Sequence, residues 1–342
     1  MSDSTFAETS AGGIGLTERL DARSRQLIHD DAQAEQDRDS GPSPGACERS
    51  NDDLAQAATT FAALRPRLFG IAYRMLASSS DAEDVVQEAW VRWQNYQRRG
   101  TILDPAAFLS TITTRLSINV LQSAHARRET YIGPWLPEPV DTSSDPALGA
   151  ERGEALGFAV LLLLEKLTPT ERAAYILREA FDYPYRQIAD TIEVTEQAAR
   201  QLVSRGRKHL TAQRRSAVDT SAQRRLLEAF LLAAQSGNVA QLEELFSAEV
   251  VSYSDGNGVK LAARIPVSGR SRVAKFVAAF SSHFWTGKSV GWVELNGQPA
   301  VTLSQDGVVT TAFTVTASAD GIEQLLWLMN PAKLGNVQAA VG

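Results

Sequence analysis

Residues 168–210 carry the most informative pattern of the chain: TPTERAAYILREAFDYPYRQIADTIEVTEQAARQLVSRGRKHL. Its spacing of apolar and polar residues predicts three short helices. In the last of them, residues 196–210, one arc is apolar and consists of Ala199, Leu202, Val203, Gly206 and Leu210. The outward face is polar and basic, and consists of Arg200, Gln201, Ser204, Arg205 and Lys208, with Arg207 at its edge.

A second short helix, residues 185–192, precedes the basic one, and only Glu193-Val194-Thr195 separates them. Thr195 is a suitable N-cap for the second of the pair. Between Thr195 and Arg215 there are six Lys or Arg residues against one acid, Glu196. Two short helices, a tight turn and a one-signed outer face predict a DNA-binding helix-turn-helix. An ordinary helical hairpin with a solvated charged face is the alternative, and the turn lacks the glycine often found there.

Composition limits the broad class of protein. The chain has 342 residues, 44% of them hydrophobic, which is enough for two or three domains. Its net charge is −6, but residues 1–60 hold twelve acids against five bases, so the remainder is close to neutral and a local basic face is compatible. The single cysteine, Cys47, fits a reducing cytoplasm. The N-terminus has no signal-peptide pattern, and no apolar run approaches the roughly 20 residues that a membrane span needs. The sequence therefore does not predict membrane association.

Residues from Leu54 to about Arg128 have helical spacing, with a loop marked by Arg98-Arg99-Gly100 and Asp104-Pro105. The segment DAEDVVQEAWVRW, residues 81–93, places its apolar side chains inward and an acidic face outward, formed by Asp81, Asp84, Gln87 and Glu88. Such a face suits a basic protein partner, and a merely solvated face is the alternative. A further helix over residues 106–126 carries polar positions and is closed by two arginines.

Residues 131–147 contain four prolines and a glycine and predict an interdomain linker. Trp135 and Leu136 are unusual in a plain spacer, so we expect them to dock on another surface. From residue 219 a helix leads into short β-rich runs, at 250–254, 260–265, 290–295, 298–304, 308–317 and 323–329, separated by turn pairs such as Asn296-Gly297. A helix from residue 269 interrupts them, and the pattern predicts a small α+β cone with a curved antiparallel sheet and a pocket.

The same segments resemble a known family. Residues 61–128 resemble region 2, and residues 157–210 region 4, of an extracytoplasmic-function (ECF) sigma factor of the sigma-70 family. The tail is similar to the SnoaL-like cone. WLPEP at 135–139 matches the linker motif of an ECF subgroup with such a tail, DGNGVK at 255–260 resembles its DGGGK motif, and NPAKL at 330–334 resembles NPDKL.

The resemblance implies a multidomain protein with two all-α domains and a C-terminal α+β cone. The expected parts are a disordered tail over 1–52, region 2 over 53–130, a linker over 131–147, region 4 over 148–214 and a SnoaL-like regulatory domain over 219–338. The protein would lend promoter selectivity to RNA polymerase core, would not be an enzyme, and would need no cofactor or metal.

The resemblance also implies roles for particular residues. The residues expected to bind the β′ clamp helices of the polymerase are Asp81, Glu83, Asp84, Gln87 and Glu88. Those expected to bind the upstream promoter element are Arg200, Gln201, Ser204, Arg205, Arg207 and Lys208. Those expected to capture the melting downstream element are Arg115, Asn119, Arg127 and Arg128. The expected regulatory contacts are Trp135, Leu136, Asp255, Gly256, Lys260, Asn330, Pro331 and Lys333.

Two other function classes remain open at this level. One is a one-component helix-turn-helix regulator with a ligand-sensing tail, which would not need the acidic helix. The other is an enzyme with a helical appendage. The tail has one histidine, His283, and its aspartates at 255, 306 and 320 all fall in turn pairs, so a structural histidine is the better interpretation and a pocket ligand stays possible.

Overall fold

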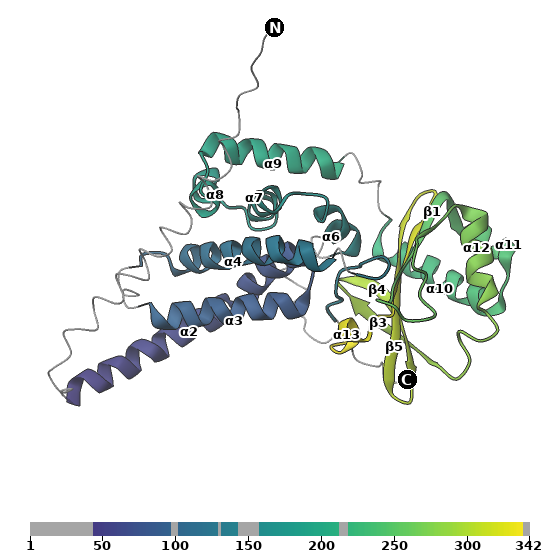
Figure 1. Ribbon diagram of the computed structural model, residues 1–342, viewed down its shortest axis with the longest axis horizontal. Coiled ribbons are helices and arrows are strands. Elements are labelled where there is room, and N and C mark those ends of the chain that lie inside the picture. The colour runs from purple at the N-terminus through teal and green to yellow at the C-terminus, as the bar shows by residue number, and fades with distance from the viewer. Residues whose placement is uncertain (1–43, 97–101, 129–130, 143–156, 212–217, 338–342) are drawn as a thin grey trace, which may run out of the picture. The chain divides into compact units, whose positions relative to one another are not determined.

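The computed structural model describes residues 44–96, 102–128, 131–142, 157–211 and 218–337, with side-chain surroundings given from residue 53 and not for 124–128 or 211 (Figure 1). The elements from residue 56 onward form one of two compact units, the other being residues 1–55.

Among the described residues, three helices precede the linker: α2 (Pro44–Leu76), α3 (Ser79–Asn95) and α4 (Pro105–Arg128). Helix α2 extends back into the segment expected to be disordered, whereas residues 1–43 lie outside the described residues. The Ser78 side chain accepts from the Asp81 backbone N–H and caps α3. Trp93 is buried and its indole N–H donates to the Ala57 carbonyl at 3.1 Å, so it is a core residue.

Between the linker and the C-terminal domain, the described residues form the helices α6 (Phe158–Leu164), α7 (Pro169–Glu179), α8 (Tyr185–Ile192) and α9 (Glu196–Thr211). Thr168 and Glu171 form a capping box that fixes the start of α7. Figure 1 shows α9 running across α7 and α8. The predicted helix-turn-helix, α8 and α9, is therefore present with its expected bounds.

The C-terminal domain combines four helices with a six-stranded sheet. The helices are α10 (Thr220–Ser236), α11 (Val239–Leu245), α12 (Arg270–Ala279) and α13 (Pro331–Leu334). The strands are β1 (Phe246–Asp255), β2 (Val267–Ser268), β3 (Ser289–Leu295), β4 (Gln298–Gln305), β5 (Val308–Ser318) and β6 (Gly321–Leu328).

The strand order is β2-β1-β6-β5-β4-β3, and β1 pairs with β6 in parallel. The sheet is mixed, so the expected all-antiparallel pairing is wrong at this one pair; β1 and β6 are far apart in the chain, and local turn signals carry no information about such partners. The expected strand at 260–265 is also wrong. The chain turns back there, because the Val259 N–H bonds to the Gly256 carbonyl and the Ala262 N–H to that of Val259.

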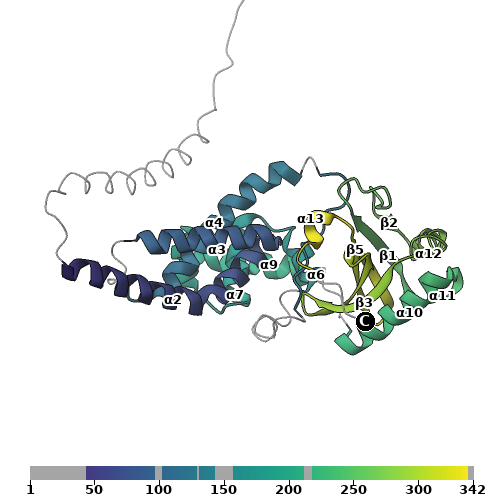
Figure 2. The ribbon, with the colours of Figure 1, turned by 90° about the horizontal axis from the view of Figure 1, so that it is seen from below.

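Each face of the sheet is buried against a different set of elements. One face packs on α10, α11 and α12 through a core that includes Phe230, Phe313 and Trp327. Figure 2 shows these three helices gathered on one side of the strands. The other face carries a second core in which Leu136 of the linker and Phe158 of α6 join Leu326 and Leu328 of β6. The linker and the first helix of the predicted region 4 thus complete the outer face of the C-terminal domain.

Candidate functional site

The outward face of α9 is solvent-exposed at all six predicted DNA-binding positions. Arg200 pairs with Glu196 and lies over the Tyr185 ring, and the Arg207 guanidinium donates to Glu179 at 2.7 Å, which raises the pKa of Arg207. Among the described residues, Arg205 and Lys208 make no ion pair. Gly206 lets the helix approach its neighbour, since a Cβ there would lie 3.1 Å from the Tyr175 ring. The geometry leaves a cationic face free for a polyanion.

The turn of the helix-turn-helix is made without glycine. Glu193 adopts the left-handed conformation, with φ 57° and ψ 47°, and ends α8. Thr195 then accepts from the Ala198 N–H at 3.2 Å, which confirms it as the cap of α9. Glu193 thus adopts the positive-φ conformation that a glycine would adopt at lower cost, so the turn forms without a glycine.

The predicted acidic face of α3 is also on the surface. Glu83, Asp84, Gln87 and Glu88 are exposed, and Asp81 is half-buried in the first turn. Arg65 pairs with Glu83 at 2.6 Å and Arg92 with Glu88 at 2.8 Å, both at exposed positions. Because exposed ion pairs are weak, these arginines do not prevent a stronger basic partner from binding.

Arg115, predicted to hold melted DNA, is engaged within the protein. Its guanidinium donates to the carbonyls of Thr191 and Asp190, at 2.9 Å each, and pairs with Glu193 at 3.2 Å. These three partners end α8, so Arg115 ties α4 to the helix-turn-helix. Asn119 is exposed one turn further along α4. Arg127 and Arg128 are in the last turn of α4, and their side chains lie outside the described residues.

The linker meets the C-terminal domain at a buried ion pair. Asp255, at the end of β1, is fully buried, and the Lys333 ammonium of α13 lies 2.7 Å from its Oδ2. The same ammonium donates to the Leu136 carbonyl at 2.5 Å, and the Leu136 N–H donates to Asp255 Oδ2 at 2.8 Å. Both charges are therefore paired and both backbone groups of Leu136 are satisfied, as burial requires. We call this set the linker cluster.

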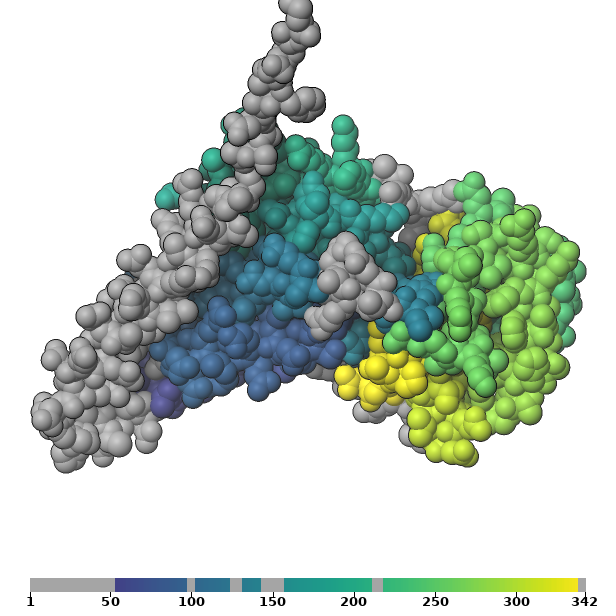
Figure 3. Space-filling view, viewed as in Figure 1, coloured from purple at the N-terminus to yellow at the C-terminus, as the bar shows by residue number. Residues whose placement is uncertain are grey.

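Aromatic and amide side chains complete the linker cluster. The Tyr131 hydroxyl donates to Asp255 Oδ1 and accepts from the Asn330 amide, the latter at 2.8 Å. Burial, with the hydrogen bond to Asp255, raises the pKa of Tyr131, so the phenol stays a proton donor. The Trp135 ring centroid lies 4.2 Å from the Lys333 ammonium. Figure 3 shows part of the linker at the surface beside the C-terminal domain, near α13 in yellow.

Five of the eight predicted regulatory residues thus come together: Trp135, Leu136, Asp255, Asn330 and Lys333. Three do not make these contacts. Gly256 is next to the linker cluster and serves packing, since a Cβ there would lie 2.2 Å from that of Ala262. Lys260 and Pro331 are exposed. Asp255 directly precedes a turn, as expected, and long-range partners enclose its carboxylate.

Sequence reasoning missed a second set of linker contacts, on the helical side. Glu138 Oε2 accepts from the Ser78 hydroxyl at 3.0 Å and from the Ser80 N–H at 3.2 Å, at the start of α3. The Asn296 amide donates to the Tyr73 hydroxyl at 2.6 Å and accepts from the Val140 N–H at 3.0 Å. The sequence marked Asn296 only as a turn residue; no local signal reveals a bridge from α2 to the linker.

Two absences apply to the described residues alone. No helix among them has the length and apolar character needed to span a membrane. Within the same ranges, no group of histidine, cysteine, aspartate or glutamate side chains is arranged to hold a metal ion.

Comparison with known proteins supports the assignment of both helical parts. Residues 60–128 match the family model Sigma-70 region 2, and residues 157–210 match Sigma-70, region 4. The chain is 36% identical over 287 residues to the ECF RNA polymerase sigma factor SigJ of Mycobacterium tuberculosis, covering 80% of this chain and 91% of the relative. It is 31% identical over 282 residues to the probable ECF RNA polymerase sigma factor SigI of the same organism, covering 81% and 94%.

A solved structure extends this similarity to the whole fold. The crystal structure of M. tuberculosis SigJ has a TM-score of 0.66 at 30% identity, and the match covers 82% of this chain and 98% of that one. The match therefore includes most of the C-terminal domain as well as the two helical parts.

Proposed function

Because this chain belongs to the ECF group of sigma-70 family factors and is a promoter-specific initiation factor for RNA polymerase, we propose roles for its exposed faces and for its C-terminal domain. The acidic face of α3 binds the β′ clamp helices of the polymerase core. The basic face of α9 enters the major groove of the upstream promoter element. The observation that supports both roles is that opposite charges lie exposed on two separate helices of one chain.

The core contact is tested by reversing charge on α3. Asp84→Lys with Glu88→Lys should weaken binding to purified polymerase core by more than about tenfold, because like charges then face the basic clamp. The matched control is Glu243→Lys with Glu244→Lys on α11, which should bind as the unmodified protein does. Equal binding by both double variants would refute the role of α3.

The downstream element is assigned to α4. Asn119 is exposed and available, whereas Arg115 is held by the end of α8. Arg115 therefore acts on melted DNA only after α8 has moved away. Arg127 and Arg128 stay candidates for phosphate contacts, because they belong to the same helix.

The C-terminal domain restrains this movement. It packs on the linker through Leu136 and on α6 through Phe158, and the linker is in turn bonded to α2 and α3 through Tyr73 and Glu138. The linker cluster therefore stabilises the closed arrangement in which α4 and α8 are joined. A contact that favours the closed state lowers apparent affinity for any partner that needs the open one.

The restraint is tested at Lys333. Lys333→Met breaks the buried pair and should raise apparent core affinity and promoter-dependent transcription. Lys260→Met, a change of the same kind at an exposed position of the same domain, should alter neither. Unchanged or weaker core binding by Lys333→Met would refute a restraining role.

The other function classes are less well supported. A one-component regulator is not favoured, because the matches cover both sigma regions. The relatives are sigma factors, which are not enzymes, and we assign no catalytic step to this chain. His283 is exposed and its Nδ1 lies 3.1 Å from the Ser282 hydroxyl, away from the apolar interior of the domain.

A further inference from the structure

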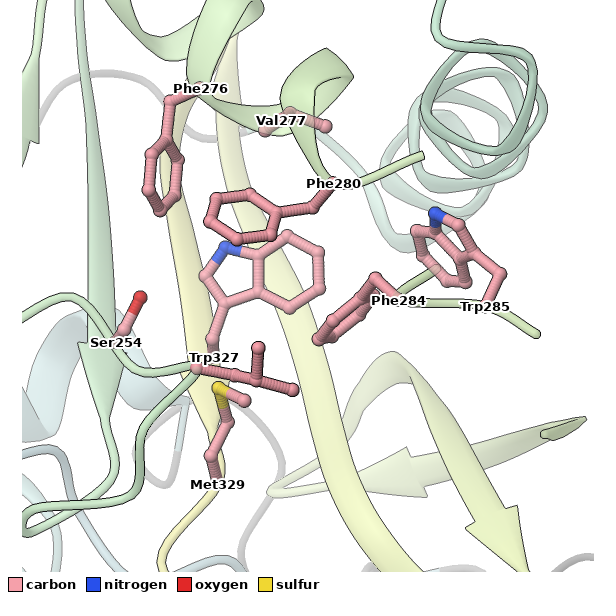
Figure 4. Close-up of a pocket in the computed structure, with 9 residues that line it drawn as sticks. Ser254, Phe276, Val277, Phe280, Phe284, Trp285, Trp327 and Met329 are labelled. Carbon is pink, nitrogen blue, oxygen red and sulfur yellow. The ribbon is translucent and has the colours of Figure 1, made fainter. Parts of the chain in front are cut away.

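The C-terminal domain contains a cavity on the face opposite the linker cluster (Figure 4). Its empty volume is about 390 Å³, counting the open space at its mouth. Aromatic rings and a thioether dominate the lining, which includes Phe276, Phe280, Phe284, Trp285, Trp327 and Met329. The remaining lining residues are Leu261, Val277 and Ser254. No lining side chain carries a charge, so an ion would lose its hydration there without compensation.

Ser254 and Trp285 each contribute a polar side-chain atom that makes no hydrogen bond to the described residues. Ser254 is 4% exposed as a whole residue, and its hydroxyl makes no hydrogen bond to the described residues. The Trp327 indole N–H, by contrast, is satisfied by the Ser252 hydroxyl at 3.1 Å. Figure 4 shows the Ser254 hydroxyl directed toward the gap beside the Phe276 ring. Because this hydroxyl opens into the cavity and is not sealed in the core, water can satisfy it, and a polar ligand atom would take the place of that water.

The chemistry of the lining defines the ligand. Ring faces and edges favour a planar aromatic group, and one hydroxyl favours one polar substituent. A cation is disfavoured, because the Lys288 ammonium lies 4.3 Å from the Phe284 ring centroid at the edge of the cavity. Because the 390 Å³ counts open solvent at the mouth, the enclosed space is small, and a single ring would lie partly in the mouth.

The cavity and the linker cluster share two chain segments. Along a strand, successive side chains point to opposite faces. Ser254 therefore faces the cavity while its neighbour Asp255 holds Leu136 and Lys333. Met329 lines the cavity while its neighbour Asn330 bonds Tyr131, and the Met329 N–H bonds the Asp255 carbonyl at 2.7 Å. A ligand that displaces Ser254 or Met329 therefore also displaces Asp255 and Asn330, which bond the linker.

We propose that this cavity binds a neutral single-ring aromatic compound with one hydrogen-bonding substituent, and that its occupancy is transmitted to the linker through Ser254-Asp255 and Met329-Asn330. The transmission rests on the restraining role proposed above, whereas the binding does not. The site therefore makes the C-terminal domain a sensor as well as a restraint.

Binding is tested on the full chain by isothermal titration with p-cresol as the probe. Saturable one-site binding is expected. Ser254→Ala should weaken it about two- to tenfold, the value of one hydrogen bond, and Ser254→Leu should abolish it by filling the space. Ser304→Ala, a matched serine change on β4, should bind as the unmodified chain does, and thermal unfolding checks that each variant is folded. The site is refuted by absence of saturable binding or by equal affinity in Ser254→Ala and Ser254→Leu.

Transmission is tested by hydrogen exchange at saturating p-cresol. The amides of residues 131–142 should change their exchange rate at least severalfold in the unmodified chain and in Ser304→Ala, but not in Ser254→Leu. Binding without any change in linker exchange would overturn the transmission and leave the cavity as a simple binding site. Neither measurement involves polymerase, so both outcomes are independent of the promoter function.

Discussion

At the scale of single residues, the linker cluster depends on one buried charge pair. Asp255 is fully buried and Lys333 is 11% exposed in its side chain, so neither charge is well hydrated. Their attraction offsets the desolvation only while both are present. Removing one partner is therefore worse than removing both.

Lys333→Met should lower the free energy of unfolding by about 3–5 kcal/mol, because it leaves the Asp255 carboxylate buried without a counter-charge. The double variant Lys333→Met with Asp255→Asn should recover a substantial part of that loss. Chemical denaturation of the four forms of the cycle measures both effects. A double variant that is less stable than Lys333→Met alone would contradict the account.

The basic face of α9 leads to a second prediction at this scale. Arg205→Ala should cost about 1–3 kcal/mol on the preferred promoter and relax specificity at one base position. Lys208→Ala should instead weaken binding to all DNA sequences alike. It should also reduce the slope of log affinity against log salt concentration by about one. Competition binding of the holoenzyme across salt concentrations separates them, with Arg225→Ala on α10 as the control. Identical behaviour of the two variants would show that α9 makes phosphate contacts only.

At the scale of elements, the tight turn between α8 and α9 sets the orientation of α9 relative to α8. Glu193 holds a left-handed conformation that costs a non-glycine residue about 1–2 kcal/mol. The pair with Arg115 is exposed and contributes little in compensation. The sequence pattern located this turn, but its conformation was visible only in the structure.

Glu193→Gly should therefore leave stability unchanged or raise it slightly, whereas Glu193→Val should lower it by about 1 kcal/mol or more, because a β-branched residue tolerates positive φ poorly. Thermal unfolding of the two variants measures the difference. Glu196→Val, in the first turn of α9 with ordinary helical geometry, serves as the control for the change of side chain alone. If Glu193→Gly proved clearly less stable than the unmodified protein, the Arg115 contact would have to be stronger than its exposure suggests.

At the scale of the whole chain, the two sigma regions share one hydrophobic core. Residues of α2, α3 and α4 and residues of α7, α8 and α9 belong to the same buried cluster. The Arg172 guanidinium of α7 donates to the Met75 carbonyl of α2 at 2.6 Å, and Arg115 of α4 bonds the end of α8. The proposed contacts of α4 and α9 with two separated promoter elements require this arrangement to open, at the cost of exposing apolar surface.

Polymerase core should therefore increase the distance between α4 and α9. Spin labels at cysteines introduced for Gln122 and Gln201, with Cys47→Ser, should move apart on core binding, as measured by pulsed electron resonance. A pair at Arg186 and Gln201, within one helix-turn-helix, should keep its distance. If the first pair also kept its distance, the protein would bind core in the closed form and the restraint proposed for the C-terminal domain would lose its basis.

The sequence by itself determined the helices, the basic face of α9, the acidic face of α3 and most strands, because these follow from local periodicity and turn residues. It also singled out Trp135, Asp255, Asn330 and Lys333 through their motifs. Only the tertiary structure decided what those motifs do. The parallel β1–β6 pair, the burial of Asp255, the bridge made by Asn296 and the capture of Arg115 by α8 all join residues distant in the chain. Such contacts are chosen by packing and by the need to pair buried charges, and no local spacing encodes that choice.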